Sequence, residues 1–185
     1  MVAAQEIPVR IDLAAYRQAA DDAAREGRIL ELIDGELVEK MPSFVPSSIA
    51  MTIGAYLRIH VKERGLGYVT GADGGYVMGD GSVFIPDVGY ITRERLPEEP
   101  TREAPVPPDL AVEVKSPTDS VRELRRKAEK YLAAGTRLVW LVFPDEKRVE
   151  VYDGDSDVVT LGESDALTGG ALLPDFTLPI SAIFS

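Results

Sequence analysis

Hydrophobic and polar positions at the start of the chain predict a short helix followed by a β-hairpin. Residues 13–26 are rich in alanine and acidic side chains at helical spacing, which is typical of a surface helix that ends at Gly27. Apolar and polar residues then alternate over residues 29–40, on both sides of Asp34-Gly35. Because Asp-Gly between two alternating segments is a strong signal for a two-residue turn, we expect an N-terminal hairpin here.

A second helix is predicted from the apolar residues between positions 49 and 61. They recur every three or four positions and form one stripe along a helix that ends at Gly65. The preceding segment, residues 41–46, contains prolines and is typical of a turn. Ser47 or Ser48 is then placed to cap the helix, since a serine hydroxyl accepts a hydrogen bond from a free backbone amide.

Short strand patterns fill the middle of the chain, at residues 67–70, 75–78 and 82–91. A stretch with five prolines between residues 97 and 108 follows, and its charged residues predict an exposed connection. The segment before it offers no independent core. We therefore interpret the stretch as a loop within one domain.

The second half of the chain predicts a strand, a helix and a buried strand in succession. Residues 109–115 form the first strand, and Ser120 with Glu123 makes the capping-box pattern of a helix that runs to Ala134. The apolar run of residues 137–143 is typical of a central strand that is buried on both faces. Apolar patterns also occur in three later segments: residues 149–152 and 158–161, which we expect to form a hairpin, and the tail, residues 172–184.

The order of these elements indicates one mixed α/β domain, in the α+β sense, over residues 1–185. A chain of 185 residues and 20.1 kDa buries roughly 70% of its unfolded surface, which is enough for one core and cramped for two. The hydrophobic content of 45% is ordinary for a globular protein and excludes wholesale disorder.

The chain is acidic, with 31 Asp and Glu residues against 20 Lys and Arg residues and a formal net charge of -11. Bulk charge therefore repels nucleic acid, so any nucleic-acid role must depend on a local basic patch or on bound cations. The predicted helix at residues 120–134 is such a patch, with five basic residues: Arg122, Arg125, Arg126, Lys127 and Lys130. A solvated helix face with Arg–Glu pairs explains the same pattern. The absence of cysteine excludes disulfides, thiolate metal sites and cysteine nucleophiles.

We expect no export or membrane segment. Residues 1–10 lack the basic and apolar regions of a signal peptide. The longest wholly apolar run, residues 138–143, is far shorter than the roughly 18 residues that span a bilayer. The expected location is therefore the cytoplasm.

Three polar side chains interrupt apolar strands. Asp87 follows Pro86 inside one predicted strand, and Glu113 and Lys115 share one face of another because strand side chains alternate. The intervening loop can return the chain so that Asp87 lies beside Glu113. Two carboxylates and a lysine would then meet at one sheet edge. This trio suits metal-assisted phosphodiester hydrolysis, because Mg²⁺ binds one or two carboxylates together with waters and phosphate oxygens.

A third carboxylate often completes such a metal site. Glu36, just past the hairpin turn, is our candidate, and Glu31 and Glu39 are alternatives. Taken alone, Glu113 and Lys115 fit a solvent-facing pair on a strand better than a catalytic site. Their combination with Asp87, close to strand ends, favours catalysis.

These residues resemble the signature of the PD-(D/E)XK nuclease superfamily, with Pro86-Asp87 followed by Glu113-Val-Lys115. The wider sequence resembles the Uma-two family within it, restriction endonuclease-like proteins long catalogued as a domain of unknown function. The matching segments run in order through most of the chain: residues 31–39, 85–88, 108–117, Lys127 with 131–135, 138–144 and 173–176.

This resemblance implies a restriction-endonuclease-like fold, a central mixed sheet flanked by helices. It also implies a hydrolase, an Mg²⁺- or Mn²⁺-dependent endonuclease that cleaves DNA. Asp87 and Glu113 would bind the metal, Lys115 would activate water or stabilise the transition state, and Glu36 would assist. A homodimer is compatible with this activity, because cleavage of both strands needs two sites.

Helix lysines replace the motif lysine in many members of the family. Lys127 is the candidate here, and Tyr131 lies four residues on and therefore on the same helix face. We expect Lys127 and Tyr131 to act as auxiliary or phosphate-contacting residues, with Glu31 as a further auxiliary carboxylate. The choice between Lys115 and Lys127 stays open.

The chain lacks a histidine that relatives often carry in the turn before the second helix, where it has Ser47 and Ser48. The lone His60 lies too far along that helix to replace it and is interpreted as a helix-surface residue. Two alternatives to a DNA endonuclease therefore stay open. One is a non-catalytic binding module with the same fold, and the other is a metal-dependent phosphohydrolase of a different substrate.

Overall fold

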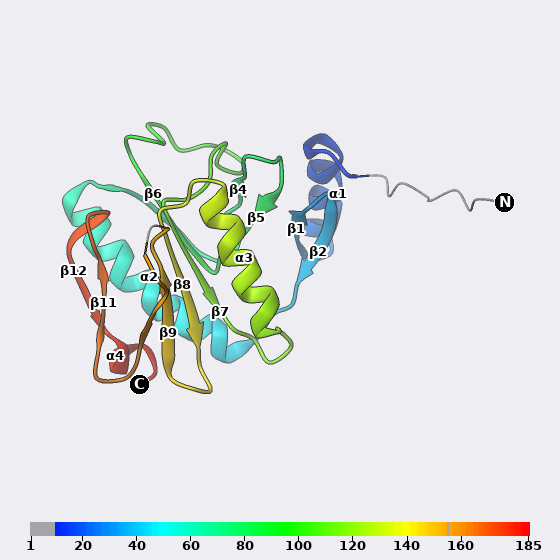
Figure 1. Ribbon diagram of the computed structural model, residues 1–185. Helices are drawn as coiled ribbons and strands as arrows, with labels where there is room; N and C mark the ends of the chain where they lie inside the picture. The colour runs from blue at the N-terminus through cyan, green and yellow to red at the C-terminus, as the bar shows by residue number, and fades with distance from the viewer. Residues whose placement is uncertain (1–9, 155) are drawn as a thin grey trace.

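A six-stranded mixed sheet forms the centre of the computed structural model, which describes residues 10–154 and 156–185 (Figure 1). The strand order is β10-β9-β8-β7-β6-β3, in which β7 and β8 are parallel and all other neighbours are antiparallel. In chain order these strands are β3 (Gly67–Thr70), β6 (Val88–Thr92), β7 (Leu110–Val114), β8 (Leu138–Phe143), β9 (Arg148–Tyr152) and β10 (Val159–Leu161). Every residue of β7 and β8 is buried, as in central strands that are covered on both faces.

A smaller four-stranded sheet contains the predicted hairpin. Its order is β2-β1-β5-β4, and its strands are β1 (Ile29–Ile33), β2 (Glu36–Lys40), β4 (Tyr76–Val77) and β5 (Val83–Phe84). Asp34 and Gly35 form the turn with φ angles of 55° and 83°, the left-handed conformation that a two-residue hairpin turn requires. The predicted N-terminal hairpin is confirmed.

Helices α2 (Phe44–Arg64) and α3 (Val121–Ala133) cover opposite faces of the central sheet (Figure 1). The α2 face is completed by the C-terminal elements β11 (Ala166–Gly169), β12 (Leu173–Pro179) and α4 (Ile180–Ile183). Helix α1 (Leu13–Arg25) packs against β1 at the edge of the molecule. The predicted mixed α+β arrangement, with a mixed sheet flanked by helices, is therefore confirmed.

The two long helices begin differently. Ser120 caps α3 as predicted, since its hydroxyl oxygen accepts from the Glu123 amide at 3.1 Å and its hydroxyl donates to the Glu123 carboxylate at 2.7 Å. Helix α2 begins at Phe44 with Ser43 at the cap position, so the expected start at Ser47 or Ser48 is wrong. Proline fits the first turn of a helix because the amides there have no partner within the helix, and Pro46 therefore did not mark a turn.

The segment expected to be one strand, residues 82–91, is two strands in different sheets. β5 pairs with β1 and β4, whereas β6 pairs with β3 and β7. Pro86 between them has no amide to donate to a sheet ladder, which favours a break at this point. The chain therefore crosses from the small sheet to the central one at Asp87.

Residues 1–9, which include most of the segment where we expect no export signal, lie outside the described residues. In the part of the chain that is described, no helix is long and apolar enough to cross a membrane.

Glu150 on β9 connects α3 to the central sheet and allows a stability test. Its carboxylate accepts from Arg125 at 3.0 Å and from the Tyr152 hydroxyl at 2.9 Å, and Arg148 pairs with it as well. Burial disfavours its charge, but these partners outweigh the burial and lower the pKa of Glu150 to about 2. We expect Glu150→Gln to lower the free energy of unfolding by about 1–3 kcal/mol at neutral pH.

A lowered carboxylate pKa stabilises the folded state above the ordinary pKa of glutamate, and this stabilisation is lost as the pH falls through the folded value. The deficit of the Glu150→Gln variant should therefore shrink between roughly pH 4.3 and pH 2, as denaturant unfolding at several pH values would measure. Glu163→Gln, which removes an exposed pair with Lys147, is the matched control. A deficit independent of pH would contradict the assignment.

Candidate active site

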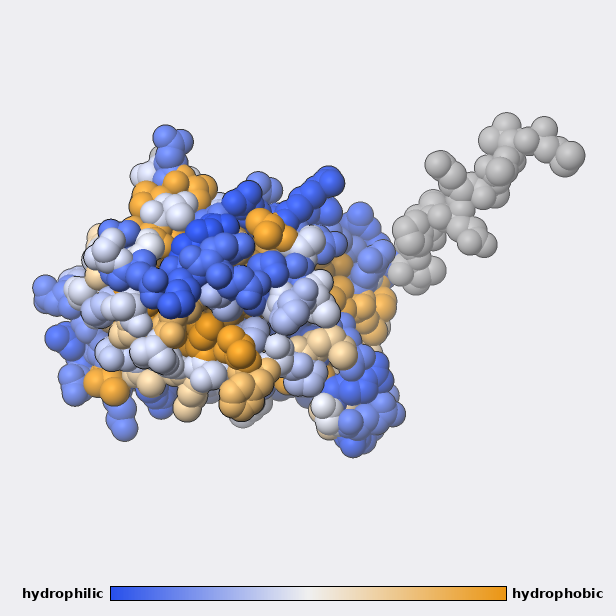
Figure 2. All heavy atoms as spheres, turned by 90° about the horizontal axis from the view of Figure 1, so that it is seen from below, coloured by the Kyte–Doolittle hydropathy of each residue, from blue (hydrophilic) through white to orange (hydrophobic). Residues whose placement is uncertain are grey.

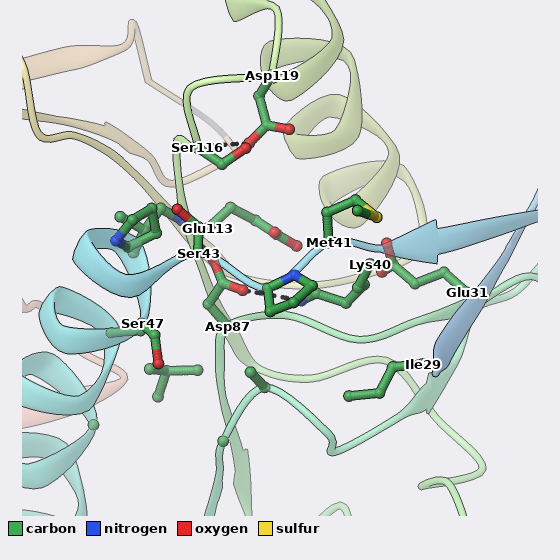
Figure 3. Close-up of a pocket in the computed structure, with 18 of the residues that line it drawn as sticks. Ile29, Glu31, Lys40, Met41, Ser43, Ser47, Asp87, Glu113, Ser116 and Asp119 are labelled. Atoms are coloured by element: carbon green, nitrogen blue, oxygen red, sulfur yellow. Dashed lines mark hydrogen bonds and ion pairs between the residues drawn. The ribbon is translucent and has the colours of Figure 1, made fainter. Parts of the chain in front are cut away.

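Asp87 and Glu113 lie at the same end of the central sheet. Asp87 immediately precedes β6, and Glu113 is in β7. These two strands are antiparallel neighbours in which Val88 lies opposite Val112. Continuing this register by one residue places Asp87 opposite Glu113. The Val114 amide donates to Asp87 Oδ2 at 2.8 Å and holds that side chain against β7. The structure thus brings the two predicted carboxylates together, and Figure 3 shows both bordering one pocket.

Helix α3 supplies the immediate partners of Glu113. The Tyr131 hydroxyl donates to Glu113 Oε1 at 2.8 Å, and Lys127 Nζ lies 2.9 Å from the same oxygen. Burial raises the pKa of Glu113, Lys127 counteracts this, and the charge of Asp87 raises it further. Burial and the Glu113 charge also raise the pKa of Tyr131 well above its ordinary value, so its phenol stays a hydrogen-bond donor.

Glu31 is the third carboxylate of this network. It projects from β1, is only 4% exposed, and accepts from the Ile85 amide at 2.7 Å. Lys127 bridges Glu31 and Glu113, with Nζ 2.8 Å from Glu31 Oε1. Burial disfavours the Lys127 charge, but the attraction of the two carboxylates outweighs it and raises the pKa of Lys127. Lys127 therefore lies between two buried carboxylates that favour its ammonium form.

Lys40 is a residue of this network that the sequence analysis missed. Its Nζ, at the end of β2, lies 2.9 Å from Asp87 Oδ1 and 2.6 Å from the carbonyl oxygen of Ile85. The hairpin register pairs Ile29 with Lys40 and Glu31 with Val38, so Lys40 and Glu31 share one face of the hairpin. The Asp-Gly turn predicts this register from the sequence. Since side chains alternate between the two faces of a strand, the register also predicts that Lys40 lies on the same face as Glu31.

Lys115 is not brought to the two carboxylates. It follows the last residue of β7, and its ammonium donates to the carbonyl oxygen of Ser116 at 3.2 Å. The expectation of Asp87, Glu113 and Lys115 as one cluster therefore differs from the structure. The lysine that contacts Glu113 is Lys127 of α3, whose Nζ lies 2.9 Å from Glu113 Oε1.

Glu36 is likewise separated from the pair of carboxylates. It shares the hairpin face of Lys40 but lies four residues away, about 13 Å along β2, where it is exposed. Glu39 points to the other face and pairs with Arg28 at 2.9 Å. Of the three carboxylates that the sequence left open, Glu31 is the one that joins Glu113 through a shared lysine.

The carboxylate and lysine network lies at the floor of a cleft of about 1990 Å³ (Figure 3). The hairpin, α2 and the start of α3 form its walls. Ser47 and Ser48 lie in the first turns of α2 and line the α2 wall. His60 does not lie on the helix surface as expected, because it is buried edge-on against Phe176 with ring centroids 5.3 Å apart.

The basic residues of α3 are divided between ion pairs and the rim of the cleft. Arg125 pairs with the buried Glu150 of β9, which differs from the solvated Arg–Glu pairs within the helix that the alternative interpretation expects. Arg122, Arg126 and Lys130 are spaced by four and form one stripe along the helix, with Arg126 and Lys130 bordering the cleft. Lys130 Nζ also lies 2.5 Å from Asp34 Oδ2 at the hairpin tip.

The donor atoms at the floor of the cleft fit a hard divalent cation. Asp87 and Glu113 offer carboxylate oxygens, which Mg²⁺ and Mn²⁺ prefer, and Mg²⁺ commonly takes only one or two protein carboxylates. Within residues 10–154 and 156–185, no three or more His, Asp and Glu side chains group closely enough to hold an ion. Lys40 and Lys127 offset part of the charge of Asp87, Glu113 and Glu31, so these carboxylates already bind positive groups.

Comparison with known proteins gives a fold and a family. No curated protein matches the chain. A crystal structure described as "a putative nuclease belonging to DUF820 from Anabaena variabilis ATCC 29413" is 22% identical, with a TM-score of 0.79 over 94% of this chain and 97% of that one. This likeness confirms the restriction-endonuclease-like fold. The model of the Uma2 (Uma-two) family, described as "Putative restriction endonuclease", matches residues 13–181, and the chain therefore belongs to that family.

Proposed function

We propose that this protein is a metal-dependent nuclease that hydrolyses DNA phosphodiester bonds at the floor of the cleft. The observation that carries the proposal is the meeting of Asp87 and Glu113, from two strands, beside two lysines in one cleft. Membership of the family described as "Putative restriction endonuclease" supports the same function.

Asp87 and Glu113 would hold Mg²⁺ or Mn²⁺ in this proposal. The Val114 amide orients one carboxylate and the Tyr131 hydroxyl orients the other, so both are positioned before an ion binds. A bound ion lowers the pKa of a water and stabilises charge that develops on the phosphate. Its charge would also offset the burial and the mutual repulsion that raise the pKa of Glu113.

Lys127 is our candidate for the lysine of the reaction, with Lys115 as the alternative that the motif suggests. Because Lys127 lies between Glu113 and Glu31, which favour its ammonium form, we assign it the role of a hydrogen-bond donor. Its ammonium can orient the attacking water or stabilise negative charge on a phosphate oxygen. Glu31 acts as a positioning residue, since it holds Lys127 Nζ from the side opposite Glu113.

The stripe of Arg122, Arg126 and Lys130 is our candidate for contacts to the DNA backbone. The formal net charge of -11 excludes attraction by the protein as a whole, so a local stripe beside the reacting groups has to supply it. Salt should therefore weaken the encounter with DNA steeply.

Titration of Mn²⁺ by calorimetry, followed by cleavage of plasmid DNA, tests the proposal. Wild type should bind Mn²⁺, Asp87→Ala and Glu113→Gln should lose the heat of binding, and only wild type should cut DNA. If wild type neither binds Mn²⁺ nor cleaves DNA, the proposal is overturned and the non-catalytic binding module is favoured. Cleavage of nucleotides alone would favour the phosphohydrolase.

Lys40 allows a sharper test of where the ion binds. Its ammonium occupies Asp87 Oδ1, the oxygen that an ion would use, so we expect Lys40→Met to bind Mn²⁺ at least about tenfold more tightly than wild type. The same calorimetry measures this change. Lys62→Met, at an exposed lysine of α2, is the control. Unchanged affinity would mean that Lys40 and the ion use different positions.

A further inference from the structure

The cleft has an apolar wall that the proposed reaction does not use. Seven of the eleven large hydrophobic side chains exposed in the described part of the chain line it: Ile29, Val38, Met41, Phe44, Met51, Tyr56 and Ile59. Phe44 is 88% exposed, Met51 73% and Met41 69%. Hydrophobic patches between hydrophilic areas are also visible on the face shown in Figure 2. Exposed apolar residues are ordinary when scattered singly, but this many around one cleft mark a binding surface.

The α3 rim of the same cleft is basic. Arg122, Arg126 and Lys130 form its stripe, and Arg126 and Lys130 border the cleft. Two carboxylates near the start of α3 are held locally, since Asp119 accepts from the Ser116 amide and Glu123 from the Ser120 hydroxyl. Phosphate groups are therefore attracted to the α3 side.

The hairpin rim has the opposite character. Glu36 is exposed there, whereas Glu39 points to the other face of the hairpin and pairs with Arg28. Asp34 at the hairpin tip pairs with Lys130 and Arg126. Phosphate groups beside Glu36 would meet its negative charge, because the lysine on the same hairpin face, Lys40, is paired with Asp87. The cleft thus favours phosphate groups along its α3 side only. The apolar wall, formed by side chains of α2 and of the hairpin segment, lines the rest of it.

We propose that the substrate is a nucleic-acid strand with unpaired bases, whose phosphates follow α3 and whose bases lie on the apolar wall. This inference rests on the proposed function and specifies its substrate class. A single strand carries phosphate along one side and offers free base faces, which stack on aromatic and apolar side chains. A duplex keeps its bases stacked inside, so it would leave the apolar wall uncovered and set its second backbone beside the hairpin carboxylates.

The position of the apolar wall also favours the substrate over a protein partner. The wall borders the same cleft as Asp87 and Glu113. A partner protein bound there would cover the proposed reacting groups. A strand bound there delivers its phosphates to them.

Fluorescence anisotropy of labelled oligodeoxythymidylate and of a duplex of equal length tests the inference, with Ca²⁺ in place of Mg²⁺ to hold back cleavage. We expect the single strand to bind wild type at least about tenfold more tightly than the duplex does. Phe44→Ala and Met51→Ala should each weaken single-strand binding about five- to hundredfold and leave duplex binding unchanged. Val159→Ala, exposed on β10 and outside the lining of the cleft, is the matched control.

Equal or tighter binding of the duplex, or no effect of Phe44→Ala, would overturn the inference. So would a dimer that Phe44→Ala converts to monomers in sedimentation without changing DNA binding, because the apolar wall would then belong to a second copy. If the protein with Mg²⁺ cleaves duplex DNA but not single strands, the proposed substrate class is wrong and the proposed nuclease function stands. If it neither binds Mn²⁺ nor cleaves any DNA, both proposals are wrong.

Discussion

Glu113→Gln should lower the rate of DNA cleavage by at least about 10³-fold, equivalent to about 4 kcal/mol of transition-state stabilisation. The amide keeps the size of the side chain and an oxygen that can accept from Tyr131, but it removes the charge that an ion needs. Asp87→Ala should have an effect of the same order, because it removes the second carboxylate. Single-turnover cleavage of labelled DNA with Mg²⁺ measures both.

Glu36→Gln is the control for this prediction. It makes the same chemical change in the same cleft, at a position about 13 Å along β2 from Lys40. Its cleavage rate should stay within about twofold of wild type, as for a surface substitution. A loss with Glu36→Gln comparable to that with Glu113→Gln would restore Glu36 to the site and contradict the arrangement described above.

The parts of the fold that the sequence predicts best are those with a local cause. Asp34-Gly35 specifies a hairpin turn, Ser120 with Glu123 specifies a helix start, and the apolar run before Pro144 specifies a central strand. Each signal depends on neighbours within a few residues. Pro86 was also visible, but its effect, a crossing between two sheets, depends on pairing partners far away in the chain.

The candidate site depends on such long-range partners. Asp87 and Glu113 were found because both interrupt apolar strands, whereas Lys40 belongs to the site only because the hairpin docks near the start of β6 and the end of β7. His60 is an opposite case, since its burial comes from the C-terminal strand β12, whose Phe176 covers it. Local patterns indicate which residues are unusual, and tertiary packing decides which of them meet.

The bridging position of Lys127 predicts the largest effect on stability. Glu113 and Glu31 are 5% and 4% exposed, and Lys127 is the ammonium that contacts both. Lys127→Met keeps the length of the side chain but leaves two buried carboxylates without this partner. We expect the free energy of unfolding to fall by about 3–5 kcal/mol at neutral pH.

The pH dependence of the Lys127→Met deficit separates charge from packing. Burial already raises the pKa of Glu113, and loss of the Lys127 charge raises it further, so the variant takes up protons at a higher pH than wild type. A raised carboxylate pKa stabilises the folded state below the ordinary pKa, and this stabilisation is lost as the pH rises through the folded value. The deficit should therefore be largest at neutral pH and shrink toward about pH 4. Lys115→Met, the control, should cost less than about 0.5 kcal/mol at every pH. A deficit of Lys127→Met that does not change with pH would mean that Lys127 contributes packing alone.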